Sequence, residues 1–339
     1  MSRAPSRVPL EQRIGEFGAS RAPLVIWFVL VALGTAALGC AMVPLGPGWL
    51  GTVGAVVVAT AFTWCLAART GGRPLVFAAL ALVCGLAAVA SDQDLLLTGA
   101  AVGTSAVAAV LGVMITVPAA GLGTAARECL LGLVVAGIGA MATVGFEPAI
   151  NKERFEYVGL GLAFVGAIVL VHRLGAGFHG LGRRGLIIVA IGAVVLAATL
   201  LYAELLRRYG SAGLVDQLLE WVAWSREHLG AFPRPIATVL GVPALAYGCH
   251  MRARRRQGWW VCAFGVAATS PAATALANPA VSVDEAALSV VYGLLVGLVL
   301  GWLLIRLDLA LTGTRGRRSR VAEQAAAVRP EPGRFAPLL

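Results

Sequence analysis

The stretch that decides the fold reads GWLGTVGAVVVATAFTWCLAA (48–68), RTGGR (69–73) and PLVFAALALVCGLAAVAS (74–91). Each of the two long runs is almost wholly apolar and can cross about 30 Å of hydrocarbon as an α-helix. The turn between them carries two arginines and two glycines. Two apolar helices joined by a short basic turn are typical of an integral membrane protein.

Apolar runs of this kind recur along the whole chain of 339 residues, separated by short polar turns. Apolar residues make up 59% of the sequence and charged residues only 13%, which is too apolar for a water-soluble globule. A backbone in lipid must satisfy its own hydrogen-bonding groups, and apolar runs of this length do so as helices. The sequence therefore predicts an all-α, polytopic transmembrane bundle of about ten helices. The predicted spans are 23–44, 48–68, 74–91, 95–117, 128–147, 157–172, 185–205, 235–250, 258–278 and 285–306.

The arginines predict the orientation of this bundle. They gather in every second turn, so that 21 of the 27 basic residues fall on the cytoplasmic side if the N-terminus lies there. The positive-inside rule favours this arrangement, which places both termini in the cytoplasm. Lys152 is the only lysine, and the abundance of Arg, Ala and Gly indicates a GC-rich bacterial genome, so we expect a multi-pass protein of a bacterial plasma membrane. The arginine clusters are expected to contact anionic lipids of the inner leaflet.

Two appendages flank the predicted transmembrane domain, residues 23–311. Residues 1–22 form a basic cytoplasmic segment whose apolar residues share one helical face, so this segment is either a short helix on the membrane surface or a disordered tail. Residues 312–339 contain several arginines and prolines and are predicted to form a disordered, basic cytoplasmic tail.

One extracytoplasmic connection, residues 206–234, is long enough to form structure of its own. At 100° per residue, Asp216, Glu220 and Glu227 fall on one side of a helix, and apolar side chains gather on the other. We expect an amphipathic helix near 212–230 that lies on the outer membrane surface. Its acidic face is either a simple solvated surface or a site for a cation or a basic partner.

Small residues repeat at four-residue intervals in two predicted helices. In the last helix these residues are Gly293, Gly297 and Gly301. The fourth helix repeats the pattern with Ala100, Thr104, Ala108 and Gly112. Such stripes let two helix backbones approach closely. They predict close packing within the bundle, and the alternative is a contact with another membrane protein or with a second copy of the chain.

The sequence holds few residues that point to catalysis. It lacks the P-loop, HExxH and GxSxG patterns, and its four histidines are not spaced to converge on a metal. No charged residue lies near the middle of a predicted span, where ion-coupled pumps usually carry one. The basic charge has a membrane explanation, so it does not indicate nucleic-acid binding. We therefore predict no catalytic residue, metal, cofactor or nucleic-acid partner.

Two predicted helices are interrupted near their middle by proline. The span 235–250 contains Gly241-Val242-Pro243, and the span 258–278 contains Thr269-Ser270-Pro271. A proline inside a helix frees a backbone carbonyl, which side chains, water or a ligand must satisfy in a membrane. Broken helices of this kind form binding sites in transporters, and ordinary proline kinks are the alternative. The lining of a substrate cavity is predicted at Gly241, Pro243, Thr269, Ser270 and Pro271.

These features suggest three functions. The first is transport or flipping of a small neutral or lipid-like substrate through a cavity beside the two broken helices. The second is a non-catalytic assembly or scaffold protein of the cell envelope that uses the glycine stripe and the 206–234 segment as contact surfaces. The third is an intramembrane enzyme acting at the outer face. A polar central cavity would favour transport, and a solid bundle with exposed apolar grooves would favour the scaffold.

Overall fold

Helices make up almost the whole chain, and no strand occurs among the residues described below. The computed structural model describes residues 21–43, 45–149, 152–174, 182–210, 212–253, 257–278, 280–325 and 331–338. The basic segment predicted for residues 1–22 lies outside these ranges except for its last two residues.

Nine of the described helical segments are long and apolar enough to cross a membrane. They follow the predicted apolar runs, which confirms a multi-pass, all-helical membrane protein. The first seven helices are α2 (Ala22–Met42), α3 (Trp49–Arg69), α4 (Pro74–Ser91), α5 (Asp94–Met114), α6 (Leu122–Phe146), α7 (Lys152–Arg173) and α8 (Gly182–Tyr209). The remaining elements are α9 (Ala212–Leu229), the π-helix η2 (Ile236–Gly241), α10 (Val242–Arg252), α11 (Gly258–Ala263), α12 (Val266–Thr269), α13 (Pro271–Leu276) and α14 (Val283–Ala325).

The predicted span 235–250 differs from a regular membrane helix. It consists of the π-helix η2 followed by the short α-helix α10. Pro243 is the cause we assign, because it has no N–H to donate to the carbonyl of Val239 one turn earlier. The N–H of Val242 instead donates to the carbonyl of Ala237, five residues back, which is the π-helical pattern.

The predicted span 258–278 is broken into three short helices, α11, α12 and α13. A tight turn joins α11 and α12. In this turn the N–H of Gly265 donates to the carbonyl of Cys262, three residues back, at 2.8 Å. Pro271 begins α13, where its missing N–H costs no helical hydrogen bond. The sequence predicted the interruptions at Pro243 and Pro271, but not the break between α11 and α12.

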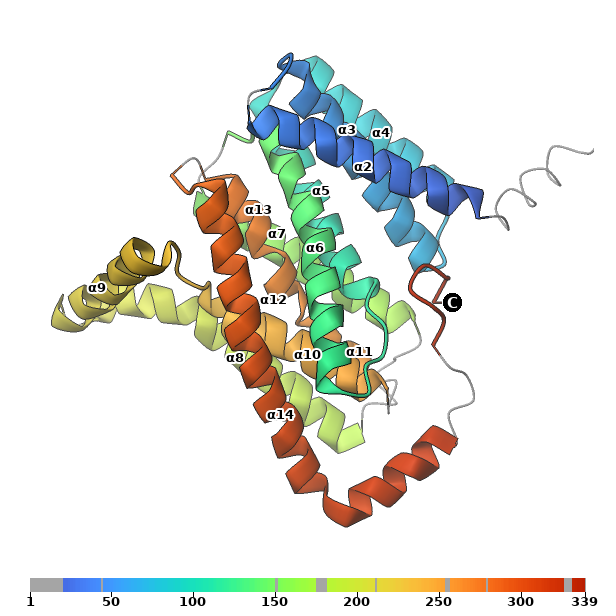
Figure 1. Cartoon of the computed structure of the whole chain (residues 1–339), viewed down its shortest axis with the longest axis vertical. Coiled ribbons are helices and arrows are strands. Elements are labelled where there is room, and N and C mark those ends of the chain that lie inside the picture. Colours follow the sequence, from blue (N-terminus) through green and yellow to red (C-terminus); the bar gives the residue numbers. More distant parts are fainter. Residues whose placement is uncertain are drawn as a thin grey trace, which may run out of the picture.

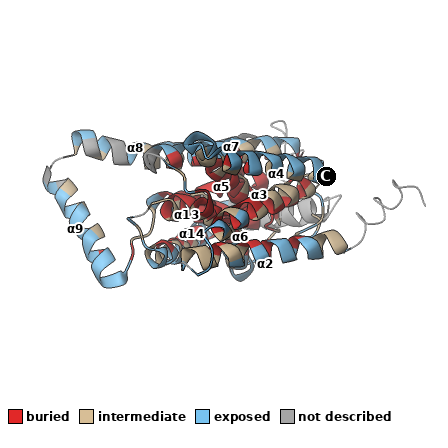
Figure 2. Cartoon of the chain, turned by 90° about the horizontal axis from the view of Figure 1, so that it is seen from above, coloured by how far each residue is buried: buried red, intermediate tan, exposed pale blue. Residues whose placement is uncertain are grey.

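The helices form a bundle with two apolar cores. In Figure 1, α2, α3 and α4 lie together at one side, α5 and α6 cross the middle, and the broken helices lie between them and α14. Figure 2 shows that buried residues concentrate on α3, α5, α6 and α13, whereas α9 is largely exposed. One buried cluster lies mainly between α2, α3, α5 and α6, with one residue each from α7 and α13. The other lies mainly between α5, α6, α7, η2 and α10 to α12, with one residue from α14.

Glycines allow the central helices to pack backbone against backbone. A Cβ added to Gly112 of α5 would lie 2.5 Å from the carbonyl oxygen of Gly132 in α6. A Cβ added to Gly145 of α6 would lie 2.1 Å from the carbonyl oxygen of Gly51 in α3. Both separations are too short for any side chain, so these crossings require glycine.

The C-terminal region differs from the disorder that its composition predicted for residues 312–339. Helix α14 continues beyond the predicted span as far as Ala325, with a bend near its lower end in Figure 1. Residues 331–338, here called the tail segment, return to the bundle and make hydrogen bonds with it. Charged residues in this tail meet buried charges of opposite sign, which composition alone does not reveal.

Candidate functional site

The most polar site in the described structure lies where α3 and α10 end, and this part of the bundle is called the arginine end below. Arg69 is the last residue of α3, and Arg252 is the last residue of α10. Glu128, in the second turn of α6, lies close to them. All three residues are buried, although ionised side chains are rarely buried without partners.

Arg252 is fully enclosed and its guanidinium is held on several sides. Its Nη1 donates to the hydroxyl of Thr116 at 2.7 Å, and its Nη2 donates to the carbonyl of Thr116 at 3.0 Å. The same Nη2 donates to Oε2 of Glu331 at 2.6 Å. The guanidinium carbon lies 3.4 Å from the ring centre of Trp259, a close cation–π contact. This geometry fixes a permanent positive charge inside the protein.

Glu128 is the buried anion of the site, with no exposed side-chain surface. Its Oε2 accepts a hydrogen bond from the backbone N–H of Val117 at 3.0 Å and from Nη1 of Arg334 at 2.7 Å. Its Oε1 accepts from Nη2 of Arg334 at 2.9 Å and from Nη2 of Arg127 at 3.0 Å. The Arg334 contact is therefore bidentate, the geometry in which arginine binds carboxylates most tightly.

Arg69 is buried, and the hydrogen bonds of its guanidinium go to backbone carbonyls. Its Nε donates to the carbonyl of Met114 at 3.0 Å, and its Nη1 donates to the carbonyls of Gly333, at 2.7 Å, and Ala336. Its Nη2 is buried and has no hydrogen-bond partner among the residues that the structure describes. An unsatisfied donor on a buried cation is costly, so the site has unused capacity for an acceptor.

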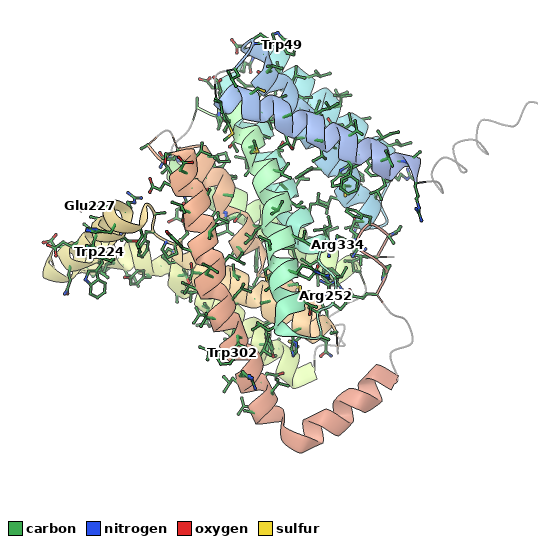
Figure 3. All side chains as sticks on the ribbon, in the orientation of Figure 1. Trp49, Trp224, Glu227, Arg252, Trp302 and Arg334 are labelled. Atoms are coloured by element: carbon green, nitrogen blue, oxygen red, sulfur yellow. The ribbon has the colours of Figure 1, made fainter. Side chains whose placement is uncertain are left out.

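The tail segment supplies a large share of the polar partners at this site. Glu331 pairs with Arg252, Arg334 pairs with Glu128, and Leu338 donates its N–H to the carbonyl of Arg69 at 2.9 Å. Figure 3 shows the side chains of Arg252 and Arg334 close together at the arginine end. The ring of Phe335 lies 5.7 Å from that of Trp27 in α2, so the tail also makes an apolar contact.

Sequence reasoning did not find this site. From the sequence, Arg69 and Arg252 were expected to lie at the membrane surface and to contact lipid, whereas the structure buries both. Glu128, Glu331 and Arg334 were not singled out at all. The five residues come from four distant segments, so no local spacing could reveal them. The one available signal was an acidic residue, Glu128, at the start of an apolar span.

The residues predicted to line a substrate cavity come together in the bundle interior. A Cβ added to Gly241 would lie 2.1 Å from the backbone nitrogen of Ala268, so η2 and α12 touch. The hydroxyl of Thr269 donates to the carbonyl of Ala109 in α5 at 2.9 Å. Pro271 lines a space of only about 10 Å³, which is the room of roughly one water. Pro243 follows Gly241 at the start of α10, and Ser270 is half-buried between α12 and α13.

The glycine stripe of α14 faces η2 and α10. A Cβ added to Gly297 would lie 2.6 Å from Cβ of Val242, and one added to Gly301 would lie 3.1 Å from Cβ of Ala246. The corresponding atom at Gly293 would lie 3.4 Å from the hydroxyl of Thr238, an ordinary contact. The structure therefore places the stripe at a contact within the chain.

The acidic residues of the amphipathic segment lie on α9. Asp216, Glu220 and Glu227 are exposed, and so are Trp221 and Trp224. Figure 3 shows Trp224 and Glu227 on the part of α9 that projects away from the bundle. Among the described side chains, no three His, Cys, Asp or Glu residues lie close enough to hold a metal ion.

An apolar groove of about 360 Å³ lies between α3, α4 and α5. Half of the residues that line it are glycine or alanine, and Cys84, Val107 and Phe146 are among the others. Leu95 and Leu96 stand at its rim and are exposed, so the groove opens to the outside of the bundle. The lining includes Ala59, Thr63, Ala81, Gly85, Ala88, Gly99, Ala100, Gly103 and Thr104.

No known protein family matches this chain, and neither the curated proteins nor the solved structures include a similar one.

Proposed function

We propose that this protein is a non-catalytic assembly protein of a membrane and that it associates with a second copy of itself through the groove between α3, α4 and α5. The observation that carries the proposal is the concave form of this groove combined with its lining of glycine and alanine. Nine helices are long and apolar enough to cross a membrane, so a groove that opens to the outside of the bundle would face lipid.

Exposed apolar side chains alone would not support an interface, because lipid covers them in a membrane. A concave surface of small residues differs from that case. Association of helices in lipid depends on close van der Waals packing, and small residues at four-residue spacing provide it. Gly99 and Gly103 of α5 have this spacing, and a Cβ added at either position would meet no atom within 4 Å.

The small-residue stripe of α5 contacts another helix of the bundle along only part of its length. Near the end of α5, Ala108 and Gly112 contact Gly139 and Gly132 of α6. Nearer its start, Ala100 and Thr104 line the open groove instead. The stripe therefore packs against α6 near the end of α5 and lines the open groove nearer the start, which supports a helix of a second copy as the occupant of the groove.

Helix α4 offers the bulky side chains that such a groove needs. Leu80, Val83 and Leu86 are all more than half exposed, while Gly85 and Ala88 are the buried residues of this helix. A two-fold axis beside α4 would insert these side chains of each copy into the groove of the other. Such a self-complementary patch is the form that a symmetric dimer interface takes.

The test fills the groove without disturbing the fold. In Gly103→Leu the new side chain enters open space, and leucine favours the helix more than glycine does. Gly161→Leu in α7 is the matched control, because Gly161 is exposed and an added Cβ there also meets nothing within 4 Å. Single-molecule photobleaching of the full-length protein in liposomes measures the dimer fraction across protein-to-lipid ratios.

We expect the wild-type protein and Gly161→Leu to share one dimer dissociation constant. Gly103→Leu should raise it by about 5- to 150-fold, as overpacking of about 1–3 kcal/mol implies. A wild-type protein that is monomeric at every ratio would overturn the proposal. Equal dimer fractions in both variants would remove the groove as the interface.

A specific observation also favours transport as a second candidate function. Two adjacent helices are broken inside the bundle, and Thr269 donates its hydrogen bond across to α5. Because η2 and α12 touch at Gly241, a substrate path beside them would require a second conformation. Thr269→Cys tests this, since transport predicts modification by a water-soluble methanethiosulfonate in membranes, and a static bundle predicts none.

A further inference from the structure

The bundle itself provides more buried positive charge than negative charge at the arginine end. Arg69 and Arg252 are buried cations from α3 and α10, and Glu128 is the buried anion from α6. Glu128 already accepts hydrogen bonds from the N–H of Val117 and from Arg127. The two cations are therefore the groups that need an acceptor from outside the bundle.

The tail segment meets this need with the chemistry of an acidic ligand. The carboxylate of Glu331 lies 2.6 Å from Nη2 of Arg252, and two backbone carbonyls approach Nη1 of Arg69. Within the described part of the chain, Nη2 of Arg69 has no hydrogen-bond partner. A neutral carbonyl is a weaker acceptor for a guanidinium than an anionic oxygen is, so the tail satisfies this pair of arginines incompletely.

We propose that Arg69 and Arg252 form a binding site for an anionic oxygen group, a phosphate or a carboxylate, and that the tail segment is its internal occupant, which such an anion displaces. This proposal is independent of the groove between α3, α4 and α5. Its support is the buried, unpartnered donor of Arg69 together with the carboxylate that already occupies the neighbouring half of the site.

The tail can leave the site without unfolding the bundle, because its own residues stay partly open to solvent while their partners on the helices are buried. Gly333 and Phe335 are exposed, and the side chains of Glu331 and Arg334 keep 17% and 21% of their surface open to solvent. When the tail leaves, Glu128 retains Arg127 and Val117, and Arg252 retains Thr116 and Trp259.

The experiment follows the tail directly in the full-length protein. Nitroxide labels at Gly123→Cys and Gly333→Cys report the distance between the start of α6 and the tail, and an added Cβ at either position meets no atom within 4 Å. Cys40 and Cys84, the native cysteines that are not buried, are replaced by alanine. Pulsed electron spin resonance then gives the distance distribution in phosphatidylcholine nanodiscs.

We expect one short, narrow distribution in phosphatidylcholine alone and a second, longer and broader population as an anion is added. Two arms identify the source of the anion, namely inorganic phosphate in solution and phosphatidylglycerol in the nanodisc. Sodium chloride at matched ionic strength controls for general screening. Displacement in the first arm indicates a free phosphate, and displacement only in the second arm indicates a lipid headgroup.

Variants of the tail test whether the anion competes with Glu331. Glu331→Gln removes the carboxylate and should lower the anion concentration for half-displacement by about tenfold or more. Glu227→Gln on the distant α9 makes the same charge change and should leave it unaltered. A distribution that is broad without anion, that neither anion changes, or that shifts equally in both variants would overturn the proposal.

Discussion

The contact between α14 and the broken segment η2–α10 allows a prediction in which two neighbouring glycines of one helix respond in opposite directions. A Cβ at Gly297 would lie 2.6 Å from Cβ and 2.9 Å from Cγ1 of Val242, and 3.2 Å from the carbonyl oxygen of Thr238. Carbon atoms prefer separations of about 3.5–4.0 Å, and the Cβ of a valine cannot rotate away. Gly297→Ala must therefore push the two helices apart.

The expected magnitude follows from two opposing effects. Overpacking of a close contact costs about 1–3 kcal/mol, and replacing glycine by alanine inside a helix returns up to about 1 kcal/mol. Gly293→Ala receives the second effect only, because its Cβ would make an ordinary 3.4 Å contact with Thr238. We expect Gly293→Ala to be more stable than Gly297→Ala by about 1–3 kcal/mol, with Gly301→Ala between them.

Titration of sodium dodecyl sulfate into mixed micelles, followed by far-ultraviolet circular dichroism, measures the free energy of unfolding of the three full-length variants. The comparison is internal, since all three make the same chemical change on the same helix. If Gly297→Ala proves as stable as Gly293→Ala, α14 does not pack against α10 as the structure shows it.

Two further predictions concern the arginine end and the topology. Glu128→Gln should lower the free energy of unfolding by about 1.5–3 kcal/mol, because it removes charged hydrogen bonds from a fully buried carboxylate. Arg127→Gln should lower it by less than about 1 kcal/mol, because the side chain of Arg127 is 61% exposed. The same titration measures both variants, and equal losses would contradict the buried pairing. The arginine pattern predicts that cysteines at positions 152 and 220 react with an impermeant maleimide in intact cells and that a cysteine at position 254 does not. Labelling at 254 from outside would reverse the predicted orientation.

Apolar runs predicted the helices because a membrane leaves the backbone no alternative to internal hydrogen bonding. The breaks were also predictable, since proline lacks the N–H that a helix needs at Pro243 and Pro271. The π-helical turn before Pro243 was not, because a proline specifies only the missing hydrogen bond. The carbonyl of Ala237 accepts from Val242 instead, and the same turn lies against Ala268 of a separate segment at Gly241.

The buried charges could not be predicted because a charge count treats every arginine in a turn alike. Arg69 and Arg73 lie four residues apart in the same turn, yet Arg69 is buried and Arg73 is exposed. The difference arises from partners far along the chain, the carbonyl of Met114 and the tail segment. Composition predicted disorder for the tail on similar grounds, since a basic, proline-containing segment has no apolar core of its own and orders only where the bundle offers matching charges.

The position of the tail segment bears on the predicted membrane topology, because the tail contacts two of the arginines from which that topology was predicted. In the sequence they indicate which turns share a side of the membrane, and in the structure Arg69 and Arg252 hold one C-terminal segment. A segment that contacts both must lie at the same end of the bundle as the turns after α3 and α10. The predicted topology places these turns and the C-terminus together for a separate reason, the charge asymmetry of the whole chain. Any revised topology that separates the C-terminus from either turn would therefore also have to abandon the ion pair between Arg252 and Glu331.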